Sequence, residues 1–265
     1  MKNNLFDLTG KIAFITGGAG LLATEHALAL NEYGAKVILA DINLDRANEI
    51  TCNLQEQQCE VDFIKCDVTS KESWEGALQY VLDKYQKIDI LINNAGFTNQ
   101  SKSKNFDATF ENFPLQDWNA IMNVNLTGAF LGCQVIGNQM LKQKSGSIIN
   151  MASLYGVVSP NHKMYPGTGI SQPVAYSVSK HGVIALTKYL ATLWAEKGIR
   201  VNSLTPGGIW NGHEGLFLER FKNLNPIGRM SDKSELRGGI VFLASEASSH
   251  VVGHNLIIDG GWTAW

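Results

Sequence analysis

A tyrosine and a lysine, Tyr176 and Lys180, stand four residues apart in the run AYSVSKHGVIALTKYLA. Apolar residues recur there at helical spacing, so both side chains lie on one face of a predicted helix. A free tyrosine has a pKa of about 10, and a neighbouring cation favours the phenolate and lowers that pKa. Such a pair could exchange a proton with a substrate oxygen. The alternative is an ordinary amphipathic helix with a surface tyrosine and lysine.

A glycine-rich turn follows the first apolar run of the chain, in ITGGAGLLATEHALAL. A strand, a glycine turn and a helix start together form an anion-binding site, because the helix N-terminus offers free N–H groups. Glycine also lets the backbone approach a pyrophosphate closely. Gly17, Gly18 and Gly20 fit this role, although other tight turns between a strand and a helix also use glycine.

An acidic residue, Asp41, ends the second predicted strand, 24 residues after Gly17. A carboxylate there can hydrogen-bond both ribose hydroxyls of NAD and would repel the 2′-phosphate of NADP. The simpler interpretation is an aspartate that starts a loop. Together with the glycine turn, Asp41 predicts NAD as the cofactor.

Short apolar runs alternate with amphipathic stretches along the whole chain. Nearly continuous apolar runs such as IAFI and DILI indicate strands buried on both faces. The alternation predicts an α/β fold, a single Rossmann-type doubly wound parallel sheet with helices on both faces. The expected strands are 11–16, 36–41, 61–66, 88–93, 146–151, 199–204 and 255–259, and the expected helices 20–33, 43–56, 70–85, 115–142, 173–197 and 232–245.

Size and composition narrow the class of protein. The 265 residues, 45% of them hydrophobic, suffice for one domain over 1–265, and no linker divides them. The net charge is −2 without a basic block, so we expect no nucleic acid and no membrane surface as partner. No apolar stretch approaches the ~20 residues that span a bilayer, and the N-terminus lacks a signal peptide. We expect a cytoplasmic protein.

The cysteines and histidines do not form a pattern typical of a metal site. The chain has four cysteines but no CxxC pair, and zinc sites use tighter ligand spacing. His162 and His213 have no carboxylate or second histidine at ligand spacing. We therefore expect no metal, and reduced structural thiols at Cys52, Cys59, Cys66 and Cys133.

Two segments interrupt the alternation, 94–114 and 154–173, and each follows a strand end. Ligands of open α/β sheets bind beyond the carboxyl ends of the strands, so both segments are candidates for the site. A later segment, 208–225, mixes aromatic and polar residues in the same way. Such side chains suit a polyhydroxylated or phosphorylated ligand, although each alone could be a solvated loop residue. The candidates for substrate contact are Tyr155, His162, Lys163, Tyr165, Trp210, Asn211, His213 and Glu214.

The chain resembles the short-chain dehydrogenase/reductase family over essentially its whole length. The resemblance rests on eight strings in family order, each at a suitable strand end. These strings are TGGAG (16–20), CDV (66–68), NNAG (93–96), NVNL (123–126), INMAS (149–153), YSVSK (176–180), PGG (206–208) and DGGW (259–262).

The resemblance implies a catalytic set of serine, tyrosine, lysine and asparagine. Tyr176 becomes the general acid/base, and Lys180 lowers its pKa and binds the nicotinamide ribose. Ser153 hydrogen-bonds the substrate oxygen and stabilises the charge that develops there. Asn125 supports a water relay from Lys180 to solvent.

The resemblance also implies which residues bind the cofactor. Besides Tyr176 and Lys180, they come from the glycine turn and from the ends of four other strands. The implied set is Gly17, Gly18, Gly20, Leu21 and Leu22 in the turn, Asp41 at the ribose, Asp67 and Val68 at the adenine, Asn93, Asn94, Ala95 and Gly96 on the adenosine ribose side, and Pro206, Gly207 and Ile209 at the nicotinamide.

The glycine turn departs from the family pattern. Leu21 and Ala23 occupy places that usually hold glycine, and a glycine, Gly20, stands one place earlier. The turn must therefore take a variant path.

The region around the catalytic set departs from the pattern as well. Ala152 stands where serine is frequent, and Asn211 stands where a threonine often lies near the cofactor. The gap from Ser153 to Tyr176 is 23 residues, longer than is typical of the family, and the extra residues form 154–173. In the family, 208–225 is a mobile lid over the substrate.

The TGGAGLL turn and the WTAW ending narrow the resemblance to a bacterial subgroup. It includes oxidoreductases of flagellin glycan and nonulosonic-acid sugar synthesis, and gluconate 5-dehydrogenases are similar. This implies hydride transfer between NAD(H) and a secondary alcohol or ketone of a small polar substrate, which is a sugar, amino sugar or sugar acid. The role that the subgroup implies is the biosynthesis of surface-glycan sugars. The alternatives are an NADPH-dependent reductase of an acyl or aromatic carbonyl and a non-catalytic nucleotide-binding protein on the same fold.

The family forms tetramers in which the last strand and the tail meet a neighbouring subunit. We therefore expect a homotetramer, or a homodimer. Trp262 and Trp265 are expected to be buried at such a contact, because an exposed tryptophan pair is unfavourable. Arg229, in NPIGRM, is expected to anchor the chain after 208–225.

Overall fold

The computed structural model describes residues 4–97 and 108–265, which form one parallel sheet of seven strands with the order β3-β2-β1-β4-β5-β6-β7. The order reverses between β1 and β4, which is the position where open α/β sheets bind ligands. The strands are β1 Ile12–Thr16, β2 Lys36–Asp41, β3 Val61–Lys65, β4 Ile90–Asn93, β5 Gly146–Met151, β6 Ile199–Pro206 and β7 Asn255–Ile258.

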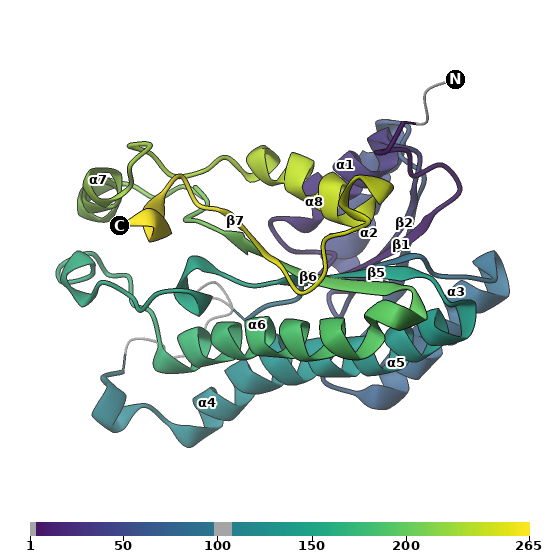
Figure 1. The fold of residues 1–265 in the computed structure, drawn as a ribbon. Helices are drawn as coiled ribbons and strands as arrows, with labels where there is room; N and C mark the ends of the chain where they lie inside the picture. The colour runs from purple at the N-terminus through teal and green to yellow at the C-terminus, as the bar shows by residue number, and fades with distance from the viewer. Residues whose placement is uncertain (1–3, 98–107) are drawn as a thin grey trace.

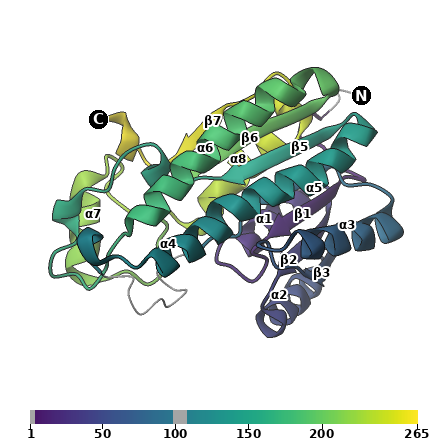
Figure 2. The ribbon, with the colours of Figure 1, turned by 90° about the horizontal axis from the view of Figure 1, so that it is seen from below.

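Helices cover both faces of the sheet, which confirms the predicted doubly wound fold. Figure 1 shows α1 and α8 above the sheet and α5 and α6 below it, and Figure 2 shows α5 and α6 crossing the lower face. The helices are α1 Ala23–Glu32, α2 Leu44–Glu56, α3 Lys71–Tyr85, α4 Leu115–Met122, α5 Gly128–Gln143, α6 Val174–Trp194, α7 Gly215–Leu224 and α8 Arg237–Ala244.

Strand β1 shows why the sheet needs both layers. Its residues are all buried, and successive side chains point to opposite faces. Ala13 and Ile15 pack into the core under α1 and α8, whereas Ile12 and Phe14 pack into the core under α3, α5 and α6. A strand without exposed positions reads as a continuous apolar run, as the sequence indicated.

The predicted helix 115–142 is one continuous helical segment that contains a π turn in its middle. Helix α4 ends at Met122, Asn123–Thr127 form a π-helical turn, and α5 continues from Gly128. Inserted π turns widen a helix locally and often lie at functional sites. As a whole, Leu115–Gln143 is long and apolar enough to cross a membrane, contrary to expectation, but half of its most apolar stretch is buried inside the fold.

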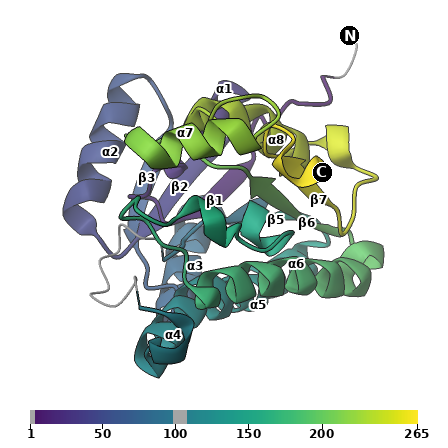
Figure 3. The same cartoon turned by 90° about the vertical axis from the view of Figure 1, so that its left-hand side faces the viewer.

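Helix α7 was missed by the sequence analysis, which treated 208–225 as a loop. Its buried residues, Phe217 and Phe221, are four positions apart and face one side. Figure 3 shows α7 in front of the sheet, on the side of the strands' carboxyl ends. The segment after the site is therefore a packed helix.

The four cysteines are free thiols, as expected. Cys59, Cys66 and Cys133 are buried, and burial raises the pKa of the Cys133 thiol to about 12 and that of Cys66 to about 11. Cys52 lies exposed on α2, so the prediction of a structural role was wrong for this residue.

Candidate active site

The catalytic tyrosine predicted from the sequence meets Ser153 beyond the carboxyl end of β5. Tyr176 lies in the first turn of α6, and Ser153 follows β5 by two residues. The Ser153 hydroxyl hydrogen-bonds the Tyr176 phenol and lowers its pKa, but burial has the larger effect and raises that pKa above its usual value. Ser153 Oγ also accepts a hydrogen bond from Tyr155 N at 3.2 Å. Both hydroxyls therefore point to one place.

Lys180 lies one helical turn beyond Tyr176 and is 5% exposed. Its Nζ donates to Met151 O at 2.7 Å and lies 5.8 Å from the centre of the Tyr176 ring. Burial lowers the pKa of this lysine to about 8. The causes of the Tyr176 shift are burial and Ser153, and the Lys180 ammonium binds a backbone carbonyl, so the lowering of the Tyr176 pKa by Lys180 stays a prediction.

Asn125 occupies the π turn between α4 and α5 and is buried. Its Nδ2 donates to Ser179 Oγ at 3.1 Å, and its Oδ1 accepts from Phe97 N at 2.6 Å. Ser179 Oγ in turn donates to Tyr176 O at 2.7 Å. Asn125 thus ties the catalytic turn of α6 to the segment after β4.

Ser179 was not singled out from the sequence, although it lies inside YSVSK. Its spacing of three residues from Tyr176 was the signal available, because positions i and i+3 share a helix face. A cofactor segment lies close by: a Cβ placed on Gly96 would be 3.9 Å from Asn125 Oδ1 and 4.0 Å from Lys180 Nζ.

The glycine turn packs tightly against the strands beside it. Gly17 has φ +65°, a left-handed value that favours glycine, and a Cβ there would lie 2.8 Å from Ala95 Cα. A Cβ on Gly18 would lie 2.8 Å from Leu39 Cβ. Gly20 N donates to Gly17 O at 2.8 Å, which closes the variant turn before α1 begins at Ala23.

Asn94 holds the glycine turn from the neighbouring strand. Its Nδ2 donates to Thr16 O at 2.9 Å, and its backbone N and that of Ala95 both donate to Thr16 Oγ1 at 3.0 Å. The Nδ2 of Asn94 therefore binds the turn, and a contact of Asn94 with the cofactor ribose stays a prediction. Thr16 was missed as a site residue, although it opens the TGGAG string.

Asp41 joins the glycine turn to the end of β2. Its Oδ2 accepts from Ala19 N at 3.0 Å, and its Oδ1 accepts from Asn43 N at 2.9 Å. A carboxylate has about four lone-pair sites, so two remain for hydroxyl donors. A half-exposed carboxylate beside a glycine turn and a helix start fits the ribose and pyrophosphate of a dinucleotide.

Two of the implied cofactor residues point into the core instead. Asn93 is buried, and its Nδ2 donates to Asn150 Oδ1 at 2.8 Å. Val68 is buried, and its side chain faces Gly128 on α5. The side chains of Asn93 and Val68 therefore do not face a cofactor, and a contact of their backbone atoms with the cofactor stays a prediction. Asp67 is exposed, and its carboxylate accepts from Thr69 N at 2.9 Å.

The segment implied to face the nicotinamide follows β6. Pro206 is the last residue of that strand, and Gly207 N donates to Ile258 O at 2.9 Å. Ile209 forms a parallel bridge with Ser231. The backbone of 206–209 is therefore held on both sides, by β7 and by the chain before α8.

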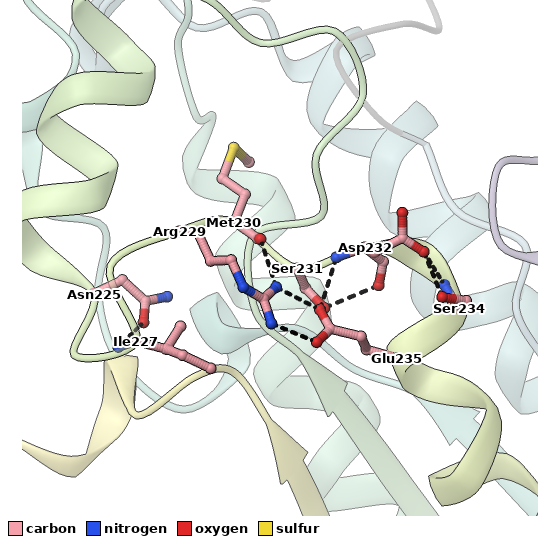
Figure 4. A network of polar contacts seen from close by, with 8 residues as sticks. All are labelled: Asn225, Ile227, Arg229, Met230, Ser231, Asp232, Ser234 and Glu235. Atoms are coloured by element: carbon pink, nitrogen blue, oxygen red, sulfur yellow. Dashed lines mark hydrogen bonds and ion pairs between the residues drawn. The ribbon is translucent and has the colours of Figure 1, made fainter.

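Arg229 anchors that chain, as predicted. Its guanidinium donates two hydrogen bonds to the Glu235 carboxylate, at 2.6 and 2.7 Å. Figure 4 shows this pair. Glu235 Oε2 also accepts from Asp232 N at 2.8 Å, in a capping box that begins the 3₁₀ turn Lys233–Leu236. This ion pair lies on the surface, beside a cavity of about 110 Å³ that Gly207 and Gly208 also line.

The insert 154–173 brings two of the substrate candidates to the catalytic tyrosine. The hydroxyls of Tyr155 and Tyr165 hydrogen-bond each other, and both phenols interact electrostatically with Tyr176. Tyr155 is buried and Tyr165 is half-buried. His162 is exposed on the 3₁₀ turn His162–Met164, and no contact of its side chain with the catalytic set is found among the described residues.

The segment 208–225 meets the insert through aromatic rings. The Phe217 ring lies 6.1 Å from Tyr165 and 5.3 Å from His213. Arg220 Nη1 donates to Met164 O at 3.0 Å and to Pro166 O at 2.6 Å. Arg220 was missed because no local pattern marks an arginine that binds carbonyls 54 or 56 residues away.

Trp210, Asn211 and Glu214 lie at the exposed edge of this segment. Trp210 is 52% exposed, and its Nε1 donates to His213 O at 3.2 Å. Asn211 N donates to His213 Nδ1 at 3.2 Å. These contacts order the segment but do not point the Trp210 ring at Tyr176. Lys163, likewise, is exposed on the insert.

The two C-terminal tryptophans differ. Trp262 is buried within its own chain, where it stacks on Phe221 with ring centres 4.6 Å apart. It therefore needs no neighbouring subunit for burial, contrary to expectation. Trp265 is 78% exposed. Of the candidate segment 94–114, residues 98–107 lie outside the described residues.

Within residues 4–97 and 108–265, no group of three histidine, cysteine or acidic side chains could hold a metal ion. The chemistry that Ser153, Tyr176 and Lys180 offer is proton transfer and hydrogen bonding. This is the set of functions that a hydride-transfer enzyme requires of its protein part.

Comparisons with known proteins agree with that chemistry. The family model adh_short_C2, described as enoyl-(acyl carrier protein) reductase, matches residues 19–263. The D-threitol dehydrogenase of Mycolicibacterium smegmatis is 34% identical over 97% of this chain and 95% of its own length. The NAD-dependent glycerol dehydrogenase of Listeria innocua is 34% identical over 97% of this chain and 96% of its own length. The crystal structure of a gluconate 5-dehydrogenase from Burkholderia cenocepacia, in complex with NADP and tartrate, superposes with a TM-score of 0.85 at 30% identity over 98% of both chains.

Proposed function

Because this chain belongs to the short-chain dehydrogenase/reductase family, an oxidoreductase family, we propose that it transfers a hydride between NAD(H) and a secondary alcohol or ketone of a sugar, amino sugar or sugar acid. One observation carries this proposal: Ser153 and Tyr176 present two hydroxyls to one place, with Lys180 5.8 Å from the tyrosine ring. When bound, the nicotinamide supplies the hydride acceptor or donor.

The protein residues handle the proton and the oxygen. The Tyr176 phenol gives its proton to a carbonyl oxygen in reduction and takes the hydroxyl proton in oxidation. Ser153 hydrogen-bonds the same oxygen while charge develops on it. Since burial raises the Tyr176 pKa, the phenol is protonated near neutral pH, and oxidation gains rate as the pH rises toward that pKa.

The reaction is tested with NAD or NADH and a panel of polyols, sugars, sugar acids, amino sugars and nucleotide sugars, followed by the absorbance of the reduced cofactor. Tyr176→Phe removes only the hydroxyl and should lower kcat/KM about 10³-fold while NAD still binds. Tyr189→Phe is the matched control, because that phenol is 68% exposed on α6. Full activity of Tyr176→Phe would refute the proposed mechanism.

Asp41 supports a preference for NAD over NADP, because its carboxylate would repel a 2′-phosphate. The relative solved with NADP shows that related proteins bind the phosphorylated cofactor. Asp41→Ala should lower the ratio of kcat/KM for NAD to kcat/KM for NADP by about tenfold or more. This factor corresponds to the loss of one hydrogen bond to a charged group. Asp45→Ala, in the first turn of α2, is the control. An unchanged ratio would remove Asp41 as the discriminating residue.

Relatives named for threitol, glycerol and gluconate support the proposed class of polyhydroxylated substrates. A role in surface-glycan sugar synthesis is the narrower proposal, and turnover of amino or nucleotide sugars in preference to polyols would support it. We also infer a cytoplasmic homotetramer, in which the exposed Trp265 meets a neighbour. Light scattering at micromolar concentration tests the assembly, and the mass of a monomer would refute it.

A further inference from the structure

Three phenols converge at the candidate active site, although the proposed chemistry uses one. Tyr155 comes two residues after Ser153, in the 3₁₀ turn Leu154–Gly156, and Tyr165 comes from the far arm of the insert. Their hydroxyls hydrogen-bond each other, and Tyr165 and Tyr176 both pack against the hydrophobic cluster that contains Tyr155. The second and third phenols therefore lie beside the reacting position.

The rings that carry these hydroxyls are held in place. Tyr155 is 8% exposed and packs in a cluster with Met164 and Phe217, against which the Tyr165 ring also lies. Arg220 fixes the backbone on both sides of Tyr165 through the carbonyls of Met164 and Pro166. Positions set by packing and hydrogen bonds are those that can discriminate between substrates.

The hydroxyl pair is suited to binding and not to proton transfer. Burial raises the pKa of Tyr155 to about 12 and that of Tyr165 further, so both phenols stay neutral over any working pH. Two phenols carry two hydrogens, and their mutual hydrogen bond uses one. Within residues 4–97 and 108–265 no other hydrogen-bond partner of these two hydroxyls is found, so the pair presents one remaining O–H donor and lone pairs. An alcohol hydroxyl, which both donates and accepts, is its complement.

We propose that the Tyr155–Tyr165 hydroxyl pair is a subsite for a second hydroxyl, on the carbon next to the one that reacts. The preferred substrate is then a vicinal diol or the corresponding hydroxyketone. Ser153 and Tyr176 bind the reacting oxygen, and the phenol pair binds its neighbour. This inference rests on the proposed function and specifies which sugars and polyols it includes.

The test compares 2,3-butanediol with 2-butanol, which share a secondary carbinol and differ by the vicinal hydroxyl. The wild-type protein should show at least tenfold higher kcat/KM for the diol, because a polar site left unpaired discriminates strongly against the analogue that lacks the hydroxyl. No preference for the diol, including no turnover of either alcohol, would overturn the subsite. Turnover of the sugar panel in that case would leave the proposed function standing.

Variants of Tyr155 and Tyr165 test whether these two phenols cause the preference for the diol. Tyr165→Phe and Tyr155→Phe keep the rings and should each reduce the diol preference about tenfold, chiefly through KM for the diol, since the second hydroxyl stays bound throughout the reaction. The double variant should lose little more, because the pair acts as a unit. Tyr189→Phe is again the control, and thermal unfolding checks that each variant is folded. An equal loss with both alcohols would show that the pair only holds the insert, and would overturn the proposal.

Discussion

The two ends of the active site are built differently. At the cofactor end, backbone groups of the glycine turn are held by Asn94 and Asp41, within a few residues of strand ends. At the substrate end, aromatic side chains from the insert, α7 and the C-terminal turn pack on one another. A ligand common to a whole family can be bound by backbone geometry, whereas a particular substrate requires particular side chains.

The largest predicted effect is a loss of stability in acid, caused by His26 on α1. This histidine interacts with Asn94, which holds the glycine turn at the cofactor end. This ring is fully buried, neither nitrogen has a well-formed hydrogen bond within the described residues, and burial lowers its pKa from 6.5 to about 3, with Asn94 acting in the opposite direction. The unfolded chain gains a proton below pH 6.5 and the folded chain does not. The free energy of unfolding should therefore fall by about 2–3 kcal/mol between pH 6.5 and about pH 4.5.

Denaturant unfolding of His26→Leu checks this prediction. Because leucine does not titrate, the variant should lose clearly less stability than the wild-type protein over the same pH range. Parallel pH profiles for the two proteins would show that other groups cause the loss.

Asn94→Ala should affect the cofactor end next most strongly. It leaves Thr16 O without its side-chain donor at 2.9 Å and loosens the turn at Gly17. We expect a loss of about 1–3 kcal/mol in unfolding free energy and weaker NAD binding, measured by calorimetry. Asn112→Ala, where the side-chain amide donates to Thr109 Oγ1 on the surface, is the matched control. A loss confined to substrate KM would contradict the division between the two ends.

Arg220→Met should act at the substrate end. It keeps an apolar stem but removes both hydrogen bonds to the insert, so Tyr165 loses its fixed position. We expect kcat/KM for the best substrate to fall about tenfold, equivalent to about 1.4 kcal/mol, with a smaller change in NAD affinity. Equal losses for substrate and cofactor would argue against separate ends.

Arg229→Met should have the smallest effect. Its ion pair with Glu235 is bidentate but exposed, with the arginine side chain 48% accessible. Exposed pairs contribute little to stability and are screened by salt. Unfolding in low and high salt measures this contribution. A loss larger than that of Asn94→Ala, unchanged by salt, would mean that the network in Figure 4 supports the Gly207 backbone more than its exposure indicates.

The sequence predicted the parts of the site that depend on local spacing. Tyr176 and Lys180 share a helix face because they are four residues apart, and the continuous apolar strands imply a sheet covered on both faces. The ends of the elements were less predictable. The π turn at Asn123–Thr127 was not predicted because a single such turn does not change the helical periodicity of the sequence. Helix α7 was not predicted because its polar residues obscure the pattern of a short amphipathic helix.

By itself, then, the sequence determined the seven strands, most of the helices between them and the helical turn that brings Tyr176 and Lys180 together, because these depend on the periodicity of neighbouring residues. Only the tertiary structure decided that Asn93 points into the core, that Trp262 stacks on Phe221, and that Tyr165 reaches Tyr155 beside the catalytic tyrosine. Those contacts join residues that no local pattern relates, and they form only when separate elements pack.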